Sequence, residues 1–284
     1  MSEGLDLAQL QRWVGREERR VDTLDPWPAA ALTAALDRED PPGPGAPLPP
    51  FWHHLYFRPV VAASRTGPDG HPRRGDFLPP VPLPRRMWAG GRLAWQRPLR
   101  IGETLERVST VRAVSLKQGR SGPLVFVLVE HRFMADGHPV LVEEHDIVYR
   151  EPPRPEEAAA PPLAPSPGPW RRRWQPDPVL LFRYSALTYN GHRIHYDHRY
   201  ATEVEGYRGV IVHGPLLATL MLDLLRRERP DAGVARFDFR ATAPLFAGEE
   251  LTVHGDPETG NGTVRLWITG PDGALAMLGT ATVC

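Results

Sequence analysis

Residues 214–230, GPLLATLMLDLLRRERP, constrain the fold more than any other segment of the chain. Leucine and methionine recur three and four residues apart, and Ala218 and Leu222 fill the gaps between them. A helix that is apolar on nearly every side is normally buried, not laid on a surface. Pro215 suits a first helical turn, and Pro230 ends the pattern. Because alternating strand-like segments follow, we expect an antiparallel sheet wrapped around this helix.

Internal repetition is the second strong signal. Residues 97–105 read RPLRIGETL and residues 243–251 read APLFAGEEL, so both share the frame x-P-L-x-x-G-E-x-L. Alternating segments flank each frame, and an Asp-Gly pair typical of a hairpin turn follows each, at 136–137 and 272–273. The shared order indicates a duplication, with three or four antiparallel strands and a helix in each half.

The helices expected in the first half are less clear. Residues 49–60 are the candidate for its buried helix, and residues 6–20 and 28–37 have the pattern of amphipathic helices. Of the 33 prolines, a dense cluster lies at 152–169, where periodicity is lost and an extended linker is expected. We therefore predict an N-terminal domain at 1–150, a linker at 151–169 and a C-terminal catalytic domain at 170–284.

The composition limits the possible binding partners and the cellular compartment. The 34 basic and 34 acidic residues cancel, and no basic stripe with interleaved aromatic residues predicts nucleic-acid binding. Cys284 is the single cysteine, so no disulfide can form within the chain, as is usual in a reducing cytoplasm. No segment has the length of a membrane span or the apolar core of a signal peptide. We expect a cytoplasmic protein without a membrane or nucleic-acid partner.

Residues 188–197, TYNGHRIHYD, raise three alternatives: a metal site, an acid–base site, or a turn whose histidines only bond the backbone. The histidine spacing lacks the HExxH pattern of helical zinc sites, so we expect no metal. A turn explains a lone histidine but explains less well the density of polar residues here. Asp197 could equally be a helix cap.

The acid–base alternative uses parts that the sequence places close together. A histidine moves protons near neutral pH, and an asparagine amide can hold a water molecule. His213 and Gly214 precede the apolar helix, whose first N–H groups suit a developing oxyanion, and glycine lets a carbonyl approach. A base, a water-holder and an oxyanion donor are what hydration of a double bond conjugated to a thioester requires.

Four segments resemble one known family. They are RYSALTYNGHRIHYDHRYA, VIVHGPLLATLMLDLL, FLPPVPLPRRMWAGGRL and KQGRSGPLVFV. They resemble the MaoC-like (R)-specific enoyl-CoA hydratases, in the branch of the mesaconyl-C4-CoA (3-methylfumaryl-CoA) hydratases and the mitochondrial-type hydroxyacyl-thioester dehydratases. The resemblance implies an α+β double hot-dog fold, in which two helix-wrapped antiparallel sheets lie side by side in one chain. It also implies a hydro-lyase that needs no cofactor, because coenzyme A is part of the substrate.

The family's hydratase motif is aspartate, any residue, asparagine, proline, an aliphatic residue and histidine. On this chain its histidine falls on His195, while Asn190 takes the aspartate position, His192 the asparagine position and Arg193 the proline position. One of the two usual acid–base side chains is therefore not ionisable. We predict that His195 moves the proton, Asn190 orients water, His192 partly replaces the missing carboxylate, and Gly214 donates its N–H to the oxyanion.

The substrate implied is an acyl-CoA whose phosphates need cationic contacts and whose remote carboxylate would need an arginine, either Arg86 or Arg193. The expected substrate-binding residues are Arg86, Trp88, Lys117, Arg120, Arg193 and His213. The arginines at 171–173 are a further option, although a solvated linker end explains them as well. Three rival functions remain: dehydration of 3-hydroxyacyl chains on acyl carrier protein, thioester hydrolysis, and acyl-CoA binding without catalysis. The expected partner is the acyl-CoA itself, and a homodimer is one assembly to test.

Overall fold

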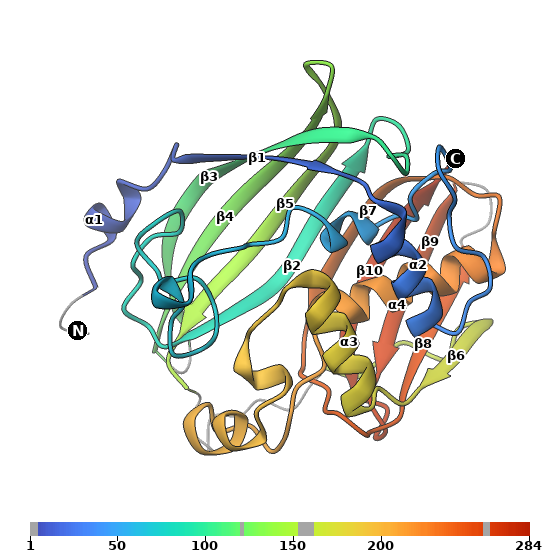
Figure 1. Ribbon diagram of the computed structural model, residues 1–284. Coiled ribbons are helices and arrows are strands. Elements are labelled where there is room, and N and C mark those ends of the chain that lie inside the picture. The colour runs from blue at the N-terminus through green and yellow to red at the C-terminus, as the bar shows by residue number, and fades with distance from the viewer. Residues whose placement is uncertain (1–4, 120–121, 153–161, 258–261) are drawn as a thin grey trace.

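The computed structural model describes residues 5–119, 122–152, 162–257 and 262–284. Its main feature is one curved antiparallel sheet of ten strands, in the order β1-β3-β4-β5-β2-β7-β10-β9-β8-β6 (Figure 1). The strands are β1 (Glu17–Thr23), β2 (Arg85–Trp95), β3 (Thr104–Gly119), β4 (Gly122–Ala135), β5 (His138–Arg150), β6 (Trp170–Trp174), β7 (Val234–Ala241), β8 (Leu251–Pro257), β9 (Thr263–Thr269) and β10 (Leu275–Val283).

The first helix precedes β1, and the later ones lie in the chain between the outer strand of a half and its central strand. They are α1 (Leu7–Gln11), α2 (Pro26–Ala35), α3 (Pro178–Thr188) and α4 (Gly214–Glu228). Shorter turns are η1 (Trp52–Leu55), η2 (Ala63–Arg65), η4 (Arg193–His195) and the π-helical η5 (Tyr200–Val204). In Figure 1, α4 crosses the strands of the second half, and α2 and α3 lie in front of it.

The two halves have the same strand order, read outward from the centre. The first half runs β2-β5-β4-β3-β1 and the second runs β7-β10-β9-β8-β6, joined by antiparallel pairing of β2 with β7. The repeated frame occupies the same place in both, between β2 and β3 and between β7 and β8. Its glycines, Gly102 (φ 89°) and Gly248 (φ 81°), both adopt the left-handed conformation that glycine tolerates best. This is the double hot-dog arrangement expected from the sequence.

Helix α4 confirms the prediction for residues 214–230. Every residue from Leu216 to Leu225 is buried, and the helix packs on β8, β9, β10 and β6. The one acid among them, Asp223, is 3% exposed and forms ion pairs with Arg38 (3.0 Å) and Arg227 (2.7 Å). A buried charge needs such partners, and they tie α4 to the segment that follows α2.

The predicted buried helix at 49–60 is wrong. Only the single turn η1 forms there, because Phe51 (φ 75°) and Phe57 (φ 54°) take left-handed conformations that end a helix on both sides. Both histidines of the turn also bond the buried carboxylate of Glu143 (3.0 and 2.8 Å). The segment fills the first half's interior with side chains, not with a helix.

The two other helix predictions have mixed outcomes. The helix expected at 28–37 is present as α2, which begins at Pro26 with Asp25 as its cap. The helix expected at 6–20 is wrong beyond Gln11, since Gly15 (φ 85°) turns the chain and residues from Glu17 pair with β3 instead. Exposed and half-buried residues alternate along β1, as is usual in an edge strand. The same charged residues would also suit the surface of a helix, so the sequence did not distinguish the two.

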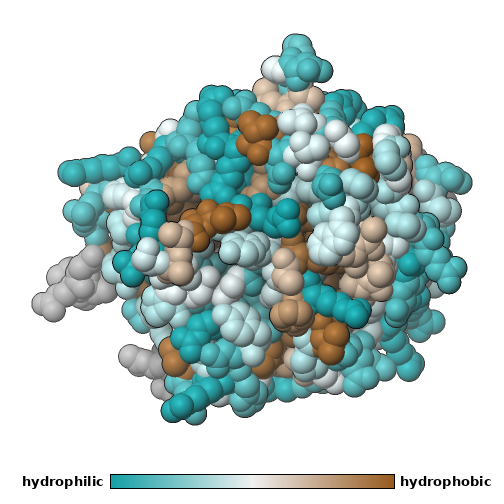
Figure 2. Space-filling model, in the orientation of Figure 1, coloured by the Kyte–Doolittle hydropathy of each residue, from teal (hydrophilic) through white to brown (hydrophobic). Residues whose placement is uncertain are grey.

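The linker prediction remains a prediction. β5 ends at Arg150 and β6 begins at Trp170, but residues 153–161 lie outside the described residues. On the face shown in Figure 2, hydrophilic residues cover most of the surface, and hydrophobic ones form small separate patches. Within the described part of the chain, no helix is long and apolar enough to cross a membrane.

Candidate active site

The histidine segment follows α3 through a tight turn. Asp177 caps the start of the helix by accepting from Leu180 N (2.7 Å), and Tyr189 (φ 54°) ends it. Asn190 then bonds back to the helix through its N–H, and its side-chain Oδ1 accepts from His192 N (3.0 Å). The side-chain oxygen of Asn190 therefore stabilises the turn. The side-chain NH₂ group of Asn190 has no partner among the described residues.

His195 lies in the short turn η4 and is 7% exposed. Its Nδ1 is 2.8 Å from the carbonyl oxygen of Ile211, and because a carbonyl can only accept, Nδ1 must donate. The neutral ring then carries its lone pair on Nε2, which has no partner among the described residues and is not sealed from solvent. Burial lowers the pKa of His195 to about 4, against the partial effect of the Ile211 bond. The ring is thus a neutral acceptor at physiological pH.

The start of α4 lies beside this ring. His213 precedes the helix, is fully buried, and stacks on His195 with ring centroids 3.7 Å apart. Ser185 Oγ lies 2.8 Å from His213 Nε2, whereas His213 Nδ1 is buried without a partner. Burial, with the nearby imidazoles of His195 and His192, lowers the pKa of His213 well below its usual value, so it stays neutral.

The first turn of α4 offers free donors. Leu217 N already bonds His213 O (3.1 Å), and Pro215 has no N–H. The N–H groups of Gly214 and Leu216 donate to no residue in the described ranges. A Cβ on Gly214 would meet nothing closer than Trp88 Cε3, at 3.9 Å. Glycine is therefore not forced here by packing, and the room in front of its N–H suits a ligand oxygen.

His192 faces a loop from the first half of the chain. Its ring lies 4.3 Å from that of His71 and 5.5 Å from that of His195. Burial lowers the pKa of His192 to about 2, and the nearby His195 ring and the positive charge of Arg86 lower it further. His192 is therefore a neutral neighbour of His195, which does not support its replacing a carboxylate's negative charge.

Two glycines bring these loops together. A Cβ on Gly70 would lie 1.8 Å from the carbonyl oxygen of Gly191, and a Cβ on Gly191 would lie 2.8 Å from that of Gly70. Arg193 N also bonds Asp69 O (2.9 Å). The first half of the chain thus forms one wall of the histidine site, at a contact that only glycine permits.

The two arginines proposed for a substrate carboxylate differ in their contacts. Arg193 is bound to Asp197 through two nitrogens (2.7 and 3.0 Å) and also donates to Pro68 O (3.1 Å). Asp197 in turn accepts from Tyr200 N (3.0 Å), so it acts as a turn and ion-pair residue. Arg86, on β2, forms no ion pair with any described residue and lies close enough to lower the pKa values of His71 and His192.

The other predicted substrate residues are spread out. Trp88 lies on β2 facing the start of α4, and its role in substrate binding remains a prediction. Lys117 is exposed near the end of β3, three strands from β2, with its Nζ over the ring of Phe126 (4.8 Å). Arg120 lies outside the described residues. Lys117 is thus not brought to the histidines.

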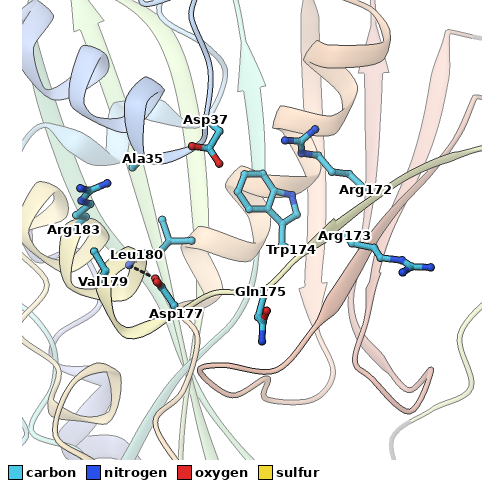
Figure 3. A pocket seen from close by; sticks show the side chains of 10 residues that line it. All are labelled: Ala35, Asp37, Arg172, Arg173, Trp174, Gln175, Asp177, Val179, Leu180 and Arg183. Atoms are coloured by element: carbon cyan, nitrogen blue, oxygen red, sulfur yellow. Dashed lines mark hydrogen bonds between the residues drawn. The ribbon is translucent and has the colours of Figure 1, made fainter.

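A separate hollow of about 360 Å³ lies at the other end of α3 (Figure 3). In that view Asp37 and Trp174 lie between Arg183 on one side and Arg172 on the other. The arginine run at 171–173 therefore lies on the edge strand β6, where Arg172 and Arg173 line this hollow and not the histidine site. The catalytic candidates follow the C-terminal end of α3, whereas the hollow surrounds its start.

Several site residues had no signal in the sequence. Ser185, the Ile211 carbonyl and His71 orient or enclose the histidines, yet each is an ordinary residue type within an unremarkable segment. Two groups in the described chain have the ligand types and spacing for a metal ion, His53–His54–Glu143 and Asp69–His71–His192. In the first group a histidine Nε2 already lies against the carboxylate, and the second lies in the field of Arg86. The expectation of no metal remains a prediction.

Comparison with known proteins identifies the family of the chain. The family model for hydroxyacyl-thioester dehydratase type 2 matches residues 51–247. The mesaconyl-C(4)-CoA hydratase of Chloroflexus aurantiacus is 45% identical over 280 residues, covering 96% of this chain and 97% of the relative. The mitochondrial hydroxyacyl-thioester dehydratase type 2 of Schizosaccharomyces pombe is 30% identical over 248 residues, covering 78% and 80%.

Solved structures support the fold. A MaoC-like dehydratase from Phytophthora capsici superposes with a TM-score of 0.67 at 14% identity, covering 99% of this chain and 98% of that one. A Mycobacterium tuberculosis protein described as a double hot dog gives 0.55 at 16% identity, with 99% of both chains covered. The chain therefore has the double hot-dog fold and belongs to the hydroxyacyl-thioester dehydratase type 2 family.

Proposed function

We propose that the chain is a hydro-lyase that reversibly adds water to a short 2-enoyl-CoA, with mesaconyl-C4-CoA or itaconyl-CoA as the best substrate candidates. Its family membership and its 45% identity to a mesaconyl-C(4)-CoA hydratase support the reaction class. The observation that carries the mechanism is the hydrogen bond from His195 Nδ1 to the Ile211 carbonyl, beside the start of α4.

The proposed reaction uses three groups. The thioester carbonyl accepts from the Gly214 N–H, where the helix dipole stabilises the negative charge that develops on its oxygen. His195 Nε2 takes a proton from water as the water oxygen bonds to the β carbon. The imidazolium then returns that proton to the α carbon, so the ring ends neutral. His213, neutral and stacked on His195, adds no positive charge that would oppose formation of the imidazolium.

Asn190 and Arg86 have supporting roles in this proposal. The free NH₂ of Asn190 donates to the attacking water, while its Oδ1 keeps the turn through His192 N. Arg86, without an ion pair among the described residues, attracts the anionic substrate, whereas Arg193 is already committed to Asp197. The cytoplasmic location expected from the single cysteine is also part of the proposal, and cell fractionation would test it.

The decisive experiment follows the conjugated thioester absorbance of crotonyl-CoA, mesaconyl-C4-CoA and itaconyl-CoA. The wild-type chain should consume at least one of them, and His195→Asn should lose about 10²–10⁴-fold in kcat/KM. His198→Asn, an exposed histidine three residues on, is the matched control and should behave as wild type. Activity that survives His195→Asn would refute the mechanism.

The rival functions give different products. A thioesterase would release free CoA thiol, which a thiol reagent detects, whereas hydration leaves the thioester intact. A dehydratase of fatty acid synthesis would prefer longer 3-hydroxyacyl chains on acyl carrier protein, and the relation to a hydroxyacyl-thioester dehydratase keeps this alternative open. A non-catalytic binder would bind crotonyl-CoA without any loss of its absorbance.

A further inference from the structure

A buried carboxylate in the first half of the chain is surrounded by histidines. Glu143, on β5, is 1% exposed. His53 Nε2 lies 3.0 Å from one of its oxygens and His54 Nε2 lies 2.8 Å from the other. His145 Nε2 lies 2.9 Å from that second oxygen, at an angle outside that of a regular hydrogen bond. No arginine or lysine in the described chain pairs with this carboxylate directly.

The charge of this cluster is unevenly distributed. Burial opposes ionisation of Glu143, but the fields of His54, His145 and His53 outweigh it and hold the pKa of Glu143 well below its usual value. His53 is completely buried, and this burial lowers its pKa to about 4. The neighbouring His131 is also kept neutral by burial and bonds Ser109 Oγ (2.7 Å). Glu143 is therefore the ionised member of the cluster, and the imidazoles of His53 and His131 are neutral.

His54 and His145, which we call the histidine pair, differ from the rest of the cluster in exposure. Their side chains are 19% and 20% exposed, against 2% for Glu143 and for His53. Their rings are nearly parallel, with centroids 5.7 Å apart. His54 Nε2 bonds the carboxylate and so carries a proton, whereas His145 Nε2 lies 2.9 Å from the same oxygen without a regular hydrogen bond. Neither Nδ1 has a partner among the described residues, so each remains available to a ligand.

The histidine pair adjoins the candidate active site through one side chain. The ring centroid of Trp88 lies 4.9 Å from that of His145 and 5.7 Å from that of His54. The same ring approaches Gly214, with Cε3 3.9 Å from the place where a Cβ would stand. Trp88 Nε1 is buried without a partner. A short acyl group whose carbonyl lies at the start of α4 would thus end near the histidine pair.

We propose that the histidine pair binds the remote carboxylate of a dicarboxylic acyl thioester whose carbonyl lies at the start of α4. This inference rests on the proposed function, because it assigns the second end of the same substrate. As the substrate carboxylate arrives, each ring takes up a proton from solvent on its free Nδ1 and donates it to that carboxylate, while the buried Glu143 carboxylate behind the pair offsets the added positive charge. Charge-assisted hydrogen bonds of this kind are the strong ones in proteins. Aromatic rings at Trp88, Phe51 and Phe239 form the rest of the wall.

A metal ion is the main competing occupant of the cluster. His53, His54 and Glu143 have ligand atoms close enough for one. Histidines that bind a metal usually donate their second ring nitrogen to a carbonyl or carboxylate. The Nδ1 atoms of His53 and His54 have no such acceptor among the described residues, and their Nε2 protons already satisfy Glu143. The geometry therefore favours an organic anion, and the experiment below includes metal as an outcome.

The test compares two saturated four-carbon thioesters that cannot be hydrated, succinyl-CoA with a free carboxylate and butyryl-CoA without one. Calorimetry on the full chain should show about tenfold or tighter binding of succinyl-CoA. His54→Phe and His145→Phe keep a flat ring and should reduce this ratio towards 1. Glu143→Gln should also reduce it, because the charge behind the pair is lost. Glu144→Gln, on the opposite face of β5 and paired with Arg92, is the matched control and should keep the ratio.

The outcomes separate the two proposals. Equal binding of both thioesters by wild type, or a ratio unaffected by the ring variants while Tm is preserved, overturns the carboxylate site alone. Failure to bind either thioester overturns the proposed function together with this site. A third outcome would make the cluster a metal site and also overturn the inference. In that outcome, wild type retains one equivalent of zinc or manganese, Glu143→Gln loses it, and neither protein prefers succinyl-CoA.

Discussion

The pKa of His195 gives the sharpest prediction for the proposed mechanism. Burial lowers it to about 4, while His192, at about 2, and His213, far below its usual value, stay neutral throughout. With a base of pKa about 4, about 90% of the free enzyme is still active at pH 5. A base with the ordinary histidine pKa of about 6.5 would leave only about 3% active at that pH. The two cases therefore differ about 30-fold.

The assay is kcat/KM from pH 4 to 8 for the crotonyl thioester of pantetheine. This substrate has neither the acyl carboxylate nor the phosphates whose own titration would distort the profile. We expect a plateau from pH 8 down to about pH 5 and a midpoint near pH 4. Melting temperatures at each pH identify the range in which the chain stays folded. His198→Asn should give the same profile as wild type.

Two results would refute the reasoning. If kcat/KM falls with a midpoint near 6.5 while the protein stays folded, the base is solvated in the free enzyme. His195 would then lie in an open cleft, and its bond to Ile211 would not represent the reactive state. A profile flat to pH 4 in both wild type and His195→Asn would exclude this ring as the base altogether.

Three further predictions concern the surroundings of the site. Gly191→Ala places a Cβ 2.8 Å from Gly70 O, so the loops must separate; we expect kcat/KM to fall about tenfold or more, and unchanged kinetics would contradict the contact. Asp223→Ala leaves the largely buried Arg38 without this partner, and urea unfolding should show a loss of about 3 kcal/mol, with Asp223→Asn as the milder control. The pKa values of His53 and His195 in the folded chain, about 4, lie below the value of about 6.5 in the unfolded chain. Below pH 6.5 the unfolded chain therefore binds protons that the folded chain does not, and the free energy of unfolding falls as the pH decreases towards 4. Urea unfolding at pH 7 and pH 5 should differ by about 2 kcal/mol for each of them, and equal stability would contradict the burial.

The second half of the fold was largely predictable from the sequence. An apolar helix such as α4 is stable only when it is buried in the core. The repeated frame with its Asp-Gly turns identifies the hairpins around it. The strands at β1 and β6 were not predicted. Both are edge strands dense in arginine, and an exposed edge can carry charged residues at alternate positions without any apolar pattern.

The candidate site was predictable in its residues but not in its contacts. His195 and Gly214 lie beside the same helix start because the hydratase motif and the apolar helix are close in sequence. The burial of Glu143 was not predicted, because a glutamate in a strand is normally expected to face solvent. Its partners lie about ninety residues away in the chain, and no local pattern reports such a contact.

The difference between the two halves explains why a duplicated sheet carries one proposed reaction site. Each half supplies five strands in the same order, yet only the second has a long helix directly before its central strand. Between α2 and β2 the described chain forms only η1 and η2, so no second helix start faces the centre. The volume is filled instead by Phe51, on which both His54 and Trp88 stack, and Trp88 also lies beside Gly214. Loss of one helix thus removes a potential oxyanion site and replaces it with a wall of aromatic and imidazole rings. One half would then do the chemistry, and the other would select the acyl group.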